Sequence, residues 1–175
     1  MWRRVRCMSA RRSSLPGMSE VSDDVRWLSD REMLAWRSYV VATLMLRHRL
    51  HRELSDEHHI SLTDYEVLVC LSMRPQNRMR MTELASMLGS TKSRLSHQVG
   101  RMEMTGLVRR GQDPEDKRGV VAELTPAGEE LLEKSAPTHV TGVRGHLIDL
   151  LTEEEQSAMG TAFSRVLAHL TEVDG

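Results

Sequence analysis

The sequence of 175 residues has little of several features that mark particular classes of protein. It contains two cysteines, Cys7 and Cys70, which excludes a disulfide-rich secreted scaffold and favours a reducing, cytoplasmic setting. No apolar run is long enough to span a membrane, and no apolar segment near the start predicts a secretory signal. Only three Trp, two Tyr and one Phe are present. With 39% hydrophobic and 28% charged residues, we expect one folded domain or two small ones.

Motifs of common enzymes are also missing. The sequence has no Gly-rich phosphate loop, no nucleophile elbow and no His-Glu-x-x-His pattern. We therefore expect a protein that is not an enzyme and that has no catalytic residue, no cofactor and no metal site.

The net charge is only −1 at pH 7, which taken alone argues against a nucleic-acid partner. The charges are unevenly placed, however. Residues 74–110 contain eight basic and two acidic residues, whereas residues 20–73 and 123–175 are both acidic overall. The first 19 residues contain five arginines and no acidic residue. A basic middle segment between acidic flanks predicts a local surface that binds anions.

Helix signals dominate the rest of the chain. A capping box at Ser29 predicts a long first helix that reaches about His58. Thr63 is the expected cap of a short second helix, and Thr82 that of a third. Thr125, followed by proline, is the expected start of a later helix.

The pattern changes in the middle of the chain. Gly89 is expected to end the third helix, and a fourth runs from Ser90 or Thr91 to Gly106. Two β-prone runs, at residues 107–110 and 120–124, flank a polar loop and predict a hairpin. A helix-turn-helix followed by a hairpin is a winged helix. The expected fold is therefore mainly α with a small β-hairpin wing, in which flanking helices form a dimerisation region around the winged helix-turn-helix core.

The fourth helix carries two different faces. Leu95, Val99 and Met102 recur at helical spacing and are expected to face the core. A second stripe contains the residue types that contact bases and phosphates. A solvated helix face would have the same spacing, but the preceding turn and the following wing favour DNA. The predicted DNA-binding residues, two of them in the wing, are Ser90, Thr91, Lys92, Ser93, Arg94, Ser96, His97, Gln98, Arg101, Lys117 and Arg118.

The wing tip contains charges of both signs. Arg118 would enter a minor groove, whose negative potential attracts arginine. Asp113, Glu115 and Asp116 would oppose this insertion unless one of them orients Arg118 through an ion pair.

Five segments of this region together resemble the MarR family of bacterial transcriptional regulators. Each segment alone is a weak signal, but the combination is specific, and residues 27–32 and 64–68 add a likeness to actinobacterial members. The five are Met-Thr-Glu-Leu-Ala at 81–85, Lys-Ser-Arg-Leu-Ser at 92–96, residues 101–110 with their Glu-x-x-Gly-Leu-Val turn, the wing at 113–119, and Leu-Thr-Pro-Ala-Gly at 124–128.

The resemblance implies a homodimer that binds a pseudo-palindromic operator in double-stranded DNA, with recognition helices in major grooves about 10 base pairs apart. Residues 61–125 would be the DNA-binding domain. Residues 25–60 and 126–173 would form the dimerisation region, and residues 1–24 a flexible basic tail.

The family also implies a repressor that a small aromatic effector releases. Trp36, Tyr39 and Tyr65 are the candidates for lining its pocket, although packing in the core or in the dimer is the simpler explanation for them.

Other functions stay open. A winged helix that binds protein instead of DNA is one, although the intact basic stripe argues against it. A redox-responsive regulator is another, but neither Cys7 nor Cys70 lies near the start of the first helix, where sensing relatives carry their cysteine. A metal-responsive regulator would need clustered ligands. The residues nearest to such a cluster are four histidines, namely His48, His51, His58 and His59. Exposure to solvent or to the dimer partner is the simpler explanation for them.

Overall fold

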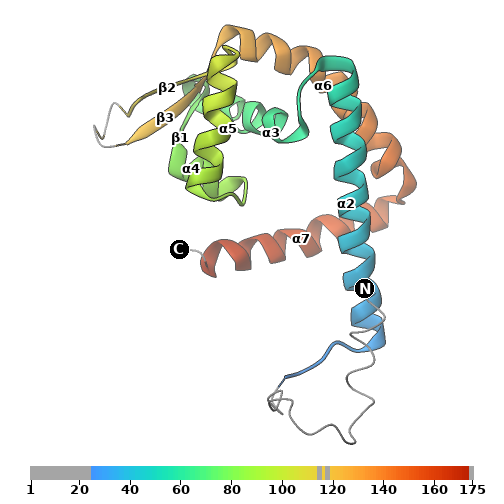
Figure 1. Ribbon diagram of the computed structural model, residues 1–175. Coiled ribbons are helices and arrows are strands. Elements are labelled where there is room, and N and C mark those ends of the chain that lie inside the picture. The colour runs from blue at the N-terminus through green and yellow to red at the C-terminus, as the bar shows by residue number, and fades with distance from the viewer. Residues whose placement is uncertain (1–24, 114–115, 117–118, 174–175) are drawn as a thin grey trace, which may run out of the picture. The chain divides into compact units, whose positions relative to one another are not determined.

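The computed structural model of the chain describes residues 25–113, 116 and 119–173 (Figure 1). The predicted tail at residues 1–24 and the wing residues Lys117 and Arg118 lie outside the described residues. The chain divides into two compact units, residues 1–38 and 39–175, and the boundary falls within a helix. None of the described helices is long and apolar enough to cross a membrane.

The described part of the first unit contains the start of helix α2 (Asp30–His58). The backbone N–H of Ser29 donates to the Glu32 carboxylate over 2.7 Å, and that of Glu32 donates to Ser29 Oγ over 3.4 Å. The Ser29 hydroxyl also donates to this carboxylate over 2.7 Å, and the donation from the hydroxyl and from the backbone N–H of Ser29 lowers the pKa of Glu32. The predicted capping box and the predicted end of the helix are both confirmed.

The second unit continues α2 and adds the elements of a winged helix in the predicted order. They are α3 (Leu62–Ser72), the 3-10 helix η1 (Pro75–Asn77), β1 (Arg78–Arg80), α4 (Met81–Met87), α5 (Lys92–Met104), β2 (Val108–Gln112), β3 (Val120–Leu124), α6 (Pro126–His146), the 3-10 helix η2 (Ile148–Leu150) and α7 (Glu153–Val173).

The sheet has three antiparallel strands in the order β1-β3-β2. Val108 lies opposite Leu124 and Gln112 opposite Val120, so β2 and β3 form the wing hairpin. The short strand β1 extends the sheet on the other side of β3, with Arg78 opposite Glu123. The expected two-stranded wing is thus the larger part of a three-stranded sheet. Figure 1 shows the hairpin reaching away from α4 and α5.

The core of the second unit lies between α3, α4, α5 and the sheet. The inward face predicted for the fourth helix is confirmed, because Leu95 and Val99 are completely buried and Met102 is nearly so. Helix α2 contributes Leu50 and Leu54 to the same cluster. This packing holds one side of α5 against the protein and leaves the other side exposed.

Two predicted helix caps are wrong. Helix α3 is capped by Ser61, whose Oγ accepts from the backbone N–H of Asp64 over 3.0 Å, and Thr63 lies inside the first turn. Helix α4 has no side-chain cap, because β1 leads directly into it at Arg80 and places Thr82 one residue inside the helix.

The remaining caps in the core are confirmed. Gly89 follows the end of α4 with a φ of 56°, a conformation that glycine adopts without a Cβ penalty. Thr91 caps α5 by accepting from the backbone N–H of Arg94 over 3.3 Å. Thr125 caps α6 by accepting from the backbone N–H of Gly128 over 3.1 Å.

Candidate nucleic-acid interface

The structure places most of the predicted DNA-binding residues on one accessible side of α5. The members that are exposed begin at the cap and continue to the last turn of the helix. They are Thr91, Lys92, Ser93, Arg94, Ser96, His97 and Arg101, whereas Ser90 and Gln98 are half-buried.

Ion pairs remove half of the basic residues in the segment 74–110 from this surface. Each pair joins an arginine of the winged core to an acidic residue of the same core, and Arg109 and Arg110 are each bound through two or more hydrogen bonds. The four pairs are Arg74–Glu83, Arg80–Asp113, Arg109–Glu123 and Arg110–Glu103.

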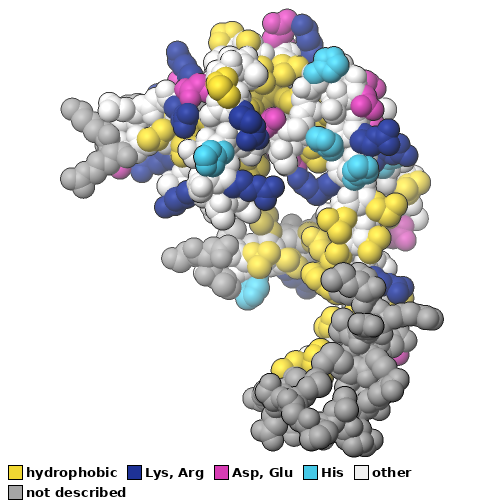
Figure 2. Space-filling model, in the orientation of Figure 1, with side chains coloured by type: hydrophobic (Ala, Val, Ile, Leu, Met, Phe, Trp, Pro, Cys, Tyr) yellow, Lys and Arg dark blue, Asp and Glu magenta, His cyan; other side chains and the backbone are white. Residues whose placement is uncertain are grey.

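The other four basic residues of this segment, Arg78, Lys92, Arg94 and Arg101, form no ion pair with any described residue. Three of the four belong to α5. The fold therefore concentrates the unpaired positive charge of the segment on the exposed side of one helix, where phosphate groups can reach it. Figure 2 shows dark blue side chains distributed over the winged core.

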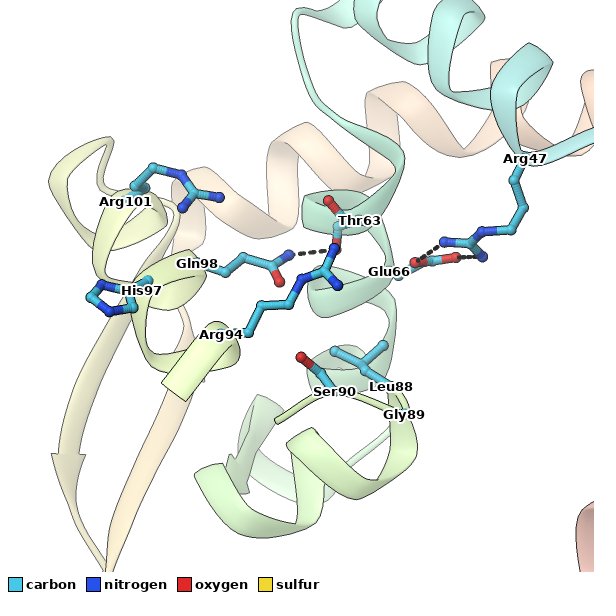
Figure 3. A pocket seen from close by; sticks show the side chains of 10 residues that line it. All are labelled: Arg47, Thr63, Glu66, Leu88, Gly89, Ser90, Arg94, His97, Gln98 and Arg101. Atoms are coloured by element: carbon cyan, nitrogen blue, oxygen red, sulfur yellow. Dashed lines mark hydrogen bonds and ion pairs between the residues drawn. The ribbon is translucent and has the colours of Figure 1, made fainter. Parts of the chain in front are cut away.

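A cavity of about 410 Å³ adjoins this surface (Figure 3). Its walls come from four places in the second unit: the middle of α2, the start of α3, the turn before α5, and α5 itself. The lining residues are Arg47, Thr63, Glu66, Leu88, Gly89, Ser90, Arg94, His97, Gln98 and Arg101.

One wall of the cavity contains an ion pair between Arg47 and Glu66. The two terminal nitrogens of Arg47 donate to the two carboxylate oxygens of Glu66 over 2.6 and 3.0 Å. The bond to Glu66 raises the pKa of Arg47. This forked pair links α2 to α3, and it leaves Arg94 and Arg101 as the lining cations without an ion pair to a described residue.

Gln98 occupies a different position from its neighbours on α5. In Figure 3 its side chain extends toward α3, whereas that of His97 extends to the other side of the helix. The Gln98 Nε2 donates to the backbone carbonyl of Thr63 over 2.8 Å and to Asp64 Oδ1 over 2.9 Å.

The base of the wing is held by an ion pair to the sheet. Arg80 Nε donates to the carboxylate of Asp113, which is only 6% exposed. The backbone N–H of Asp113 donates to the Gly119 carbonyl over 3.0 Å, and that of Gly119 donates to the Asp116 carbonyl over 2.7 Å. These bonds fix the two ends of the loop, whereas the minor-groove role of Arg118 stays a prediction.

The three candidates for an effector pocket do not line the cavity. Tyr65 is buried and packs on the His139 ring, with centroids 4.6 Å apart, and burial raises the pKa of Tyr65. Tyr39 packs against Phe163, with centroids 5.1 Å apart. Trp36 belongs to the first unit and is 47% exposed. Packing in the core explains the contact of Tyr65, whereas Tyr39 is 45% exposed, and a role of any of the three residues in effector binding stays a prediction.

The residues considered for redox and metal sensing can also be placed. Cys70 is half-buried in α3, and burial raises the pKa of its thiol. Cys7 lies outside the described residues. Within the described part of the chain no three His, Cys, Asp or Glu side chains come together as a candidate metal site.

Sequence reasoning missed several residues that build this region. Arg47 and Glu66 are 19 residues apart, and Gln98 lies 35 residues after Thr63. The sequence contains one signal for Glu66, its capping-box spacing from Thr63. That spacing predicts a bond from Glu66 to the start of the helix, whereas Glu66 pairs with Arg47 in the structure.

Comparison with known proteins agrees with this geometry. A family model described as the MarR family matches residues 60–120. The HTH-type regulator YkoM of Bacillus subtilis is 32% identical over 102 residues, which are 58% of this chain and 64% of YkoM.

Two solved structures from Streptomyces coelicolor are more similar. The MarR family regulator AbsC has a TM-score of 0.79 and 42% identity, covering 85% of this chain and 99% of AbsC. The MarR family regulator Sco3205, solved in complex with DNA, has a TM-score of 0.78 and 44% identity, covering 82% of this chain and 94% of Sco3205.

Proposed function

Since the chain belongs to the MarR family of transcriptional regulators, we propose that it is a repressor that binds a specific operator in double-stranded DNA as a homodimer and that a small-molecule effector releases. The observation that carries the proposal is the exposed side of α5, where Lys92, Arg94 and Arg101 form no ion pair with a described residue. Sco3205, which is 44% identical to this chain, was solved in complex with DNA.

The DNA contacts follow from the exposure of the side chains on α5. Arg94, His97 and Arg101 read base edges in the major groove, while Thr91, Lys92, Ser93 and Ser96 contact phosphates. Ser90 begins the turn that brings the backbone N–H groups of α5 toward a phosphate. Lys117 and Arg118 add contacts from the wing.

Binding of fluorescent DNA from upstream of the chain's own gene tests this proposal. Arg94→Ala is expected to weaken binding by about 1–3 kcal/mol, because a bidentate contact to a base is lost. Lys134→Ala is the matched control, since Lys134 is an exposed cation of α6 paired with Glu130 over 2.5 Å. Equal affinity of the two variants would contradict the assigned surface.

The salt dependence of wild-type binding should be steep, and salt-insensitive binding would contradict a DNA role.

Exposed apolar side chains support the homodimer. Val166, Leu167 and Leu170 of α7 are each about half exposed or more. Figure 2 shows hydrophobic side chains along the part of the view where α7 lies in Figure 1. A surface of this kind is unfavourable in water and suits burial against a second copy.

The oligomeric state tests the dimer directly. Leu167→Glu should convert a dimer into a monomer in light scattering, because an unpaired carboxylate would be buried in the interface. His169→Glu, two residues later and on the other side of α7, is the control and should leave the dimer intact. A monomeric wild type would contradict the proposal.

The cavity beside α5 supports release by an effector. Arg94 and Arg101 line it and also face the DNA surface, so an anionic ligand bound there would compete with DNA for the same cations. A panel of aromatic carboxylic acids, added to the preformed DNA complex, tests this part. We expect some of the acids to release the DNA from the wild-type protein. The same acids should release it less effectively from the Arg101→Lys variant. Failure of every acid would contradict an aromatic acid as the effector.

A further inference from the structure

We propose that Gln98 is a positioning residue that fixes the recognition helix α5 to the first turn of α3 and that it does not read a base. The inference rests on the proposed function, because it assigns a role within the DNA-binding surface. It separates Gln98 from the other polar residues of the same stripe.

The hydrogen bonds of the Gln98 amide carry the inference. An amide nitrogen has two N–H groups, and the two acceptors at Gln98 Nε2 are the Thr63 carbonyl at 2.8 Å and Asp64 Oδ1 at 2.9 Å. Both donors are therefore satisfied within the protein. The opposite orientation of the amide would place its oxygen against these two oxygens, so the acceptors determine which atom faces them.

Recognition of a base requires the donors that Gln98 already uses. Glutamine reads adenine with one N–H to the ring nitrogen and its carbonyl oxygen to the exocyclic amine. Gln98 could make this contact only by giving up its hydrogen bonds to the Thr63 carbonyl and the Asp64 carboxylate. Arg94 and Arg101 have no such competing bonds to a described residue.

The partners of Gln98 belong to a turn that is itself well anchored. Ser61 Oγ accepts from the backbone N–H of Asp64, and His51 Nδ1 of α2 accepts from that of Leu62 over 3.2 Å. The start of α3 is thus joined to α2 on one side and to α5, through Gln98, on the other. A contact with a fixed turn sets the angle at which α5 presents Arg94 to DNA.

A pair of substitutions at Asp64 separates the hydrogen bond from the charge. Asp64→Asn and Asp64→Ala remove the same negative charge, but only Asp64→Asn keeps an oxygen that accepts from Gln98. Both variants keep the backbone N–H that caps α3. We expect Asp64→Asn to bind the operator with an affinity close to that of wild type and Asp64→Ala to bind several-fold more weakly.

Gln98→Met tests the residue itself on the native operator and on operators altered at each base pair. A positioning role predicts that affinity falls by a similar factor, about three- to tenfold, for all of them, so discrimination between bases is preserved. The double variant Gln98→Met/Asp64→Ala should lose little more than Gln98→Met alone, because Gln98→Met already removes the bond to Asp64 together with the bond to Thr63.

Several results would overturn the proposal. Selective loss of discrimination at one base pair in Gln98→Met would show that Gln98 reads that base, and unchanged affinity in both Gln98→Met and Asp64→Ala would show that the contact does not position α5. The side-chain amide signal of Gln98 in NMR spectra of the protein without DNA should shift in Asp64→Ala and not in variants outside this contact. If that shift is seen but wild type binds no DNA, the proposed function fails while the contact stands.

Discussion

The carboxylate of Glu103, near the end of α5, accepts three hydrogen bonds from Arg110 in β2. They come from the backbone N–H over 3.1 Å, Nε over 2.9 Å and Nη2 over 2.8 Å. The recognition helix and the wing are therefore joined by one charged contact, which sets the position of one reading element relative to the other.

This contact predicts an acid-dependent loss of stability. Hydrogen bonding to Arg110 lowers the pKa of Glu103 in the folded protein. Its stabilisation is therefore complete above the usual pKa of a glutamate and is lost as the pH falls through the lowered value. The difference in urea midpoint between wild type and Glu103→Gln should shrink between pH 6 and pH 3. A difference that is constant with pH would contradict the role of this carboxylate.

A close approach at the start of α6 predicts that Gly128→Ala is destabilising. A Cβ at this position would overlap the carbonyl oxygen of Leu107 and a methyl group of Leu124. We expect a loss of about 1–3 kcal/mol in the free energy of unfolding, because backbone must move to make room. Gly160→Ala in α7 is the matched control. A Cβ there meets nothing within 4 Å, and a gain of up to about 1 kcal/mol is expected. Equal effects at the two sites would be inconsistent with the close approach.

His139 predicts a second pH effect, in the range of histidine titration. Its Nδ1 is buried without a partner among the described atoms, and burial lowers the pKa of the ring, partly opposed by Glu66. Protonation therefore costs more in the folded state, so stability is greatest above the usual pKa of a histidine and falls as the pH drops below it.

The variant His139→Phe isolates this effect, because it keeps the ring packed on Tyr65 and removes the titration. Its unfolding midpoint should change less than that of wild type between pH 7.5 and pH 5.5. Parallel curves for the two proteins would rule out His139 as the source of the acid sensitivity.

The hydrogen bond from Leu62 to His51 predicts a fourth effect on stability. His51→Leu removes the acceptor of a backbone N–H at a buried residue, which should cost about 1 kcal/mol or somewhat more. His51→Asn places an oxygen within reach of the same N–H and should recover most of the loss in thermal or urea unfolding. An Asn variant no more stable than the Leu variant would contradict the acceptor role of His51.

Local rules predicted much of the fold. The spacing of Leu95, Val99 and Met102 identified the buried side of the recognition helix, and glycine chemistry at Gly89 identified the turn before it. The cap at Thr63 failed because Ser61 offers the same chemistry two residues earlier, and the choice depends on where the incoming chain bends. Hydrophobic periodicity and cap preferences act over a few residues, so they can be read from the sequence.

The sequence by itself determined that positive charge gathers in residues 74–110, and it did so despite a net charge of −1. Only the tertiary structure decided which of these charges are available. Arg80 meets Asp113 across 33 residues and Arg109 meets Glu123 across 14, whereas Arg94 and Arg101 of α5 meet no acidic partner among the described residues. Ion pairs and hydrogen bonds extend over a few ångströms, and the fold alone determines which distant residues come within that range.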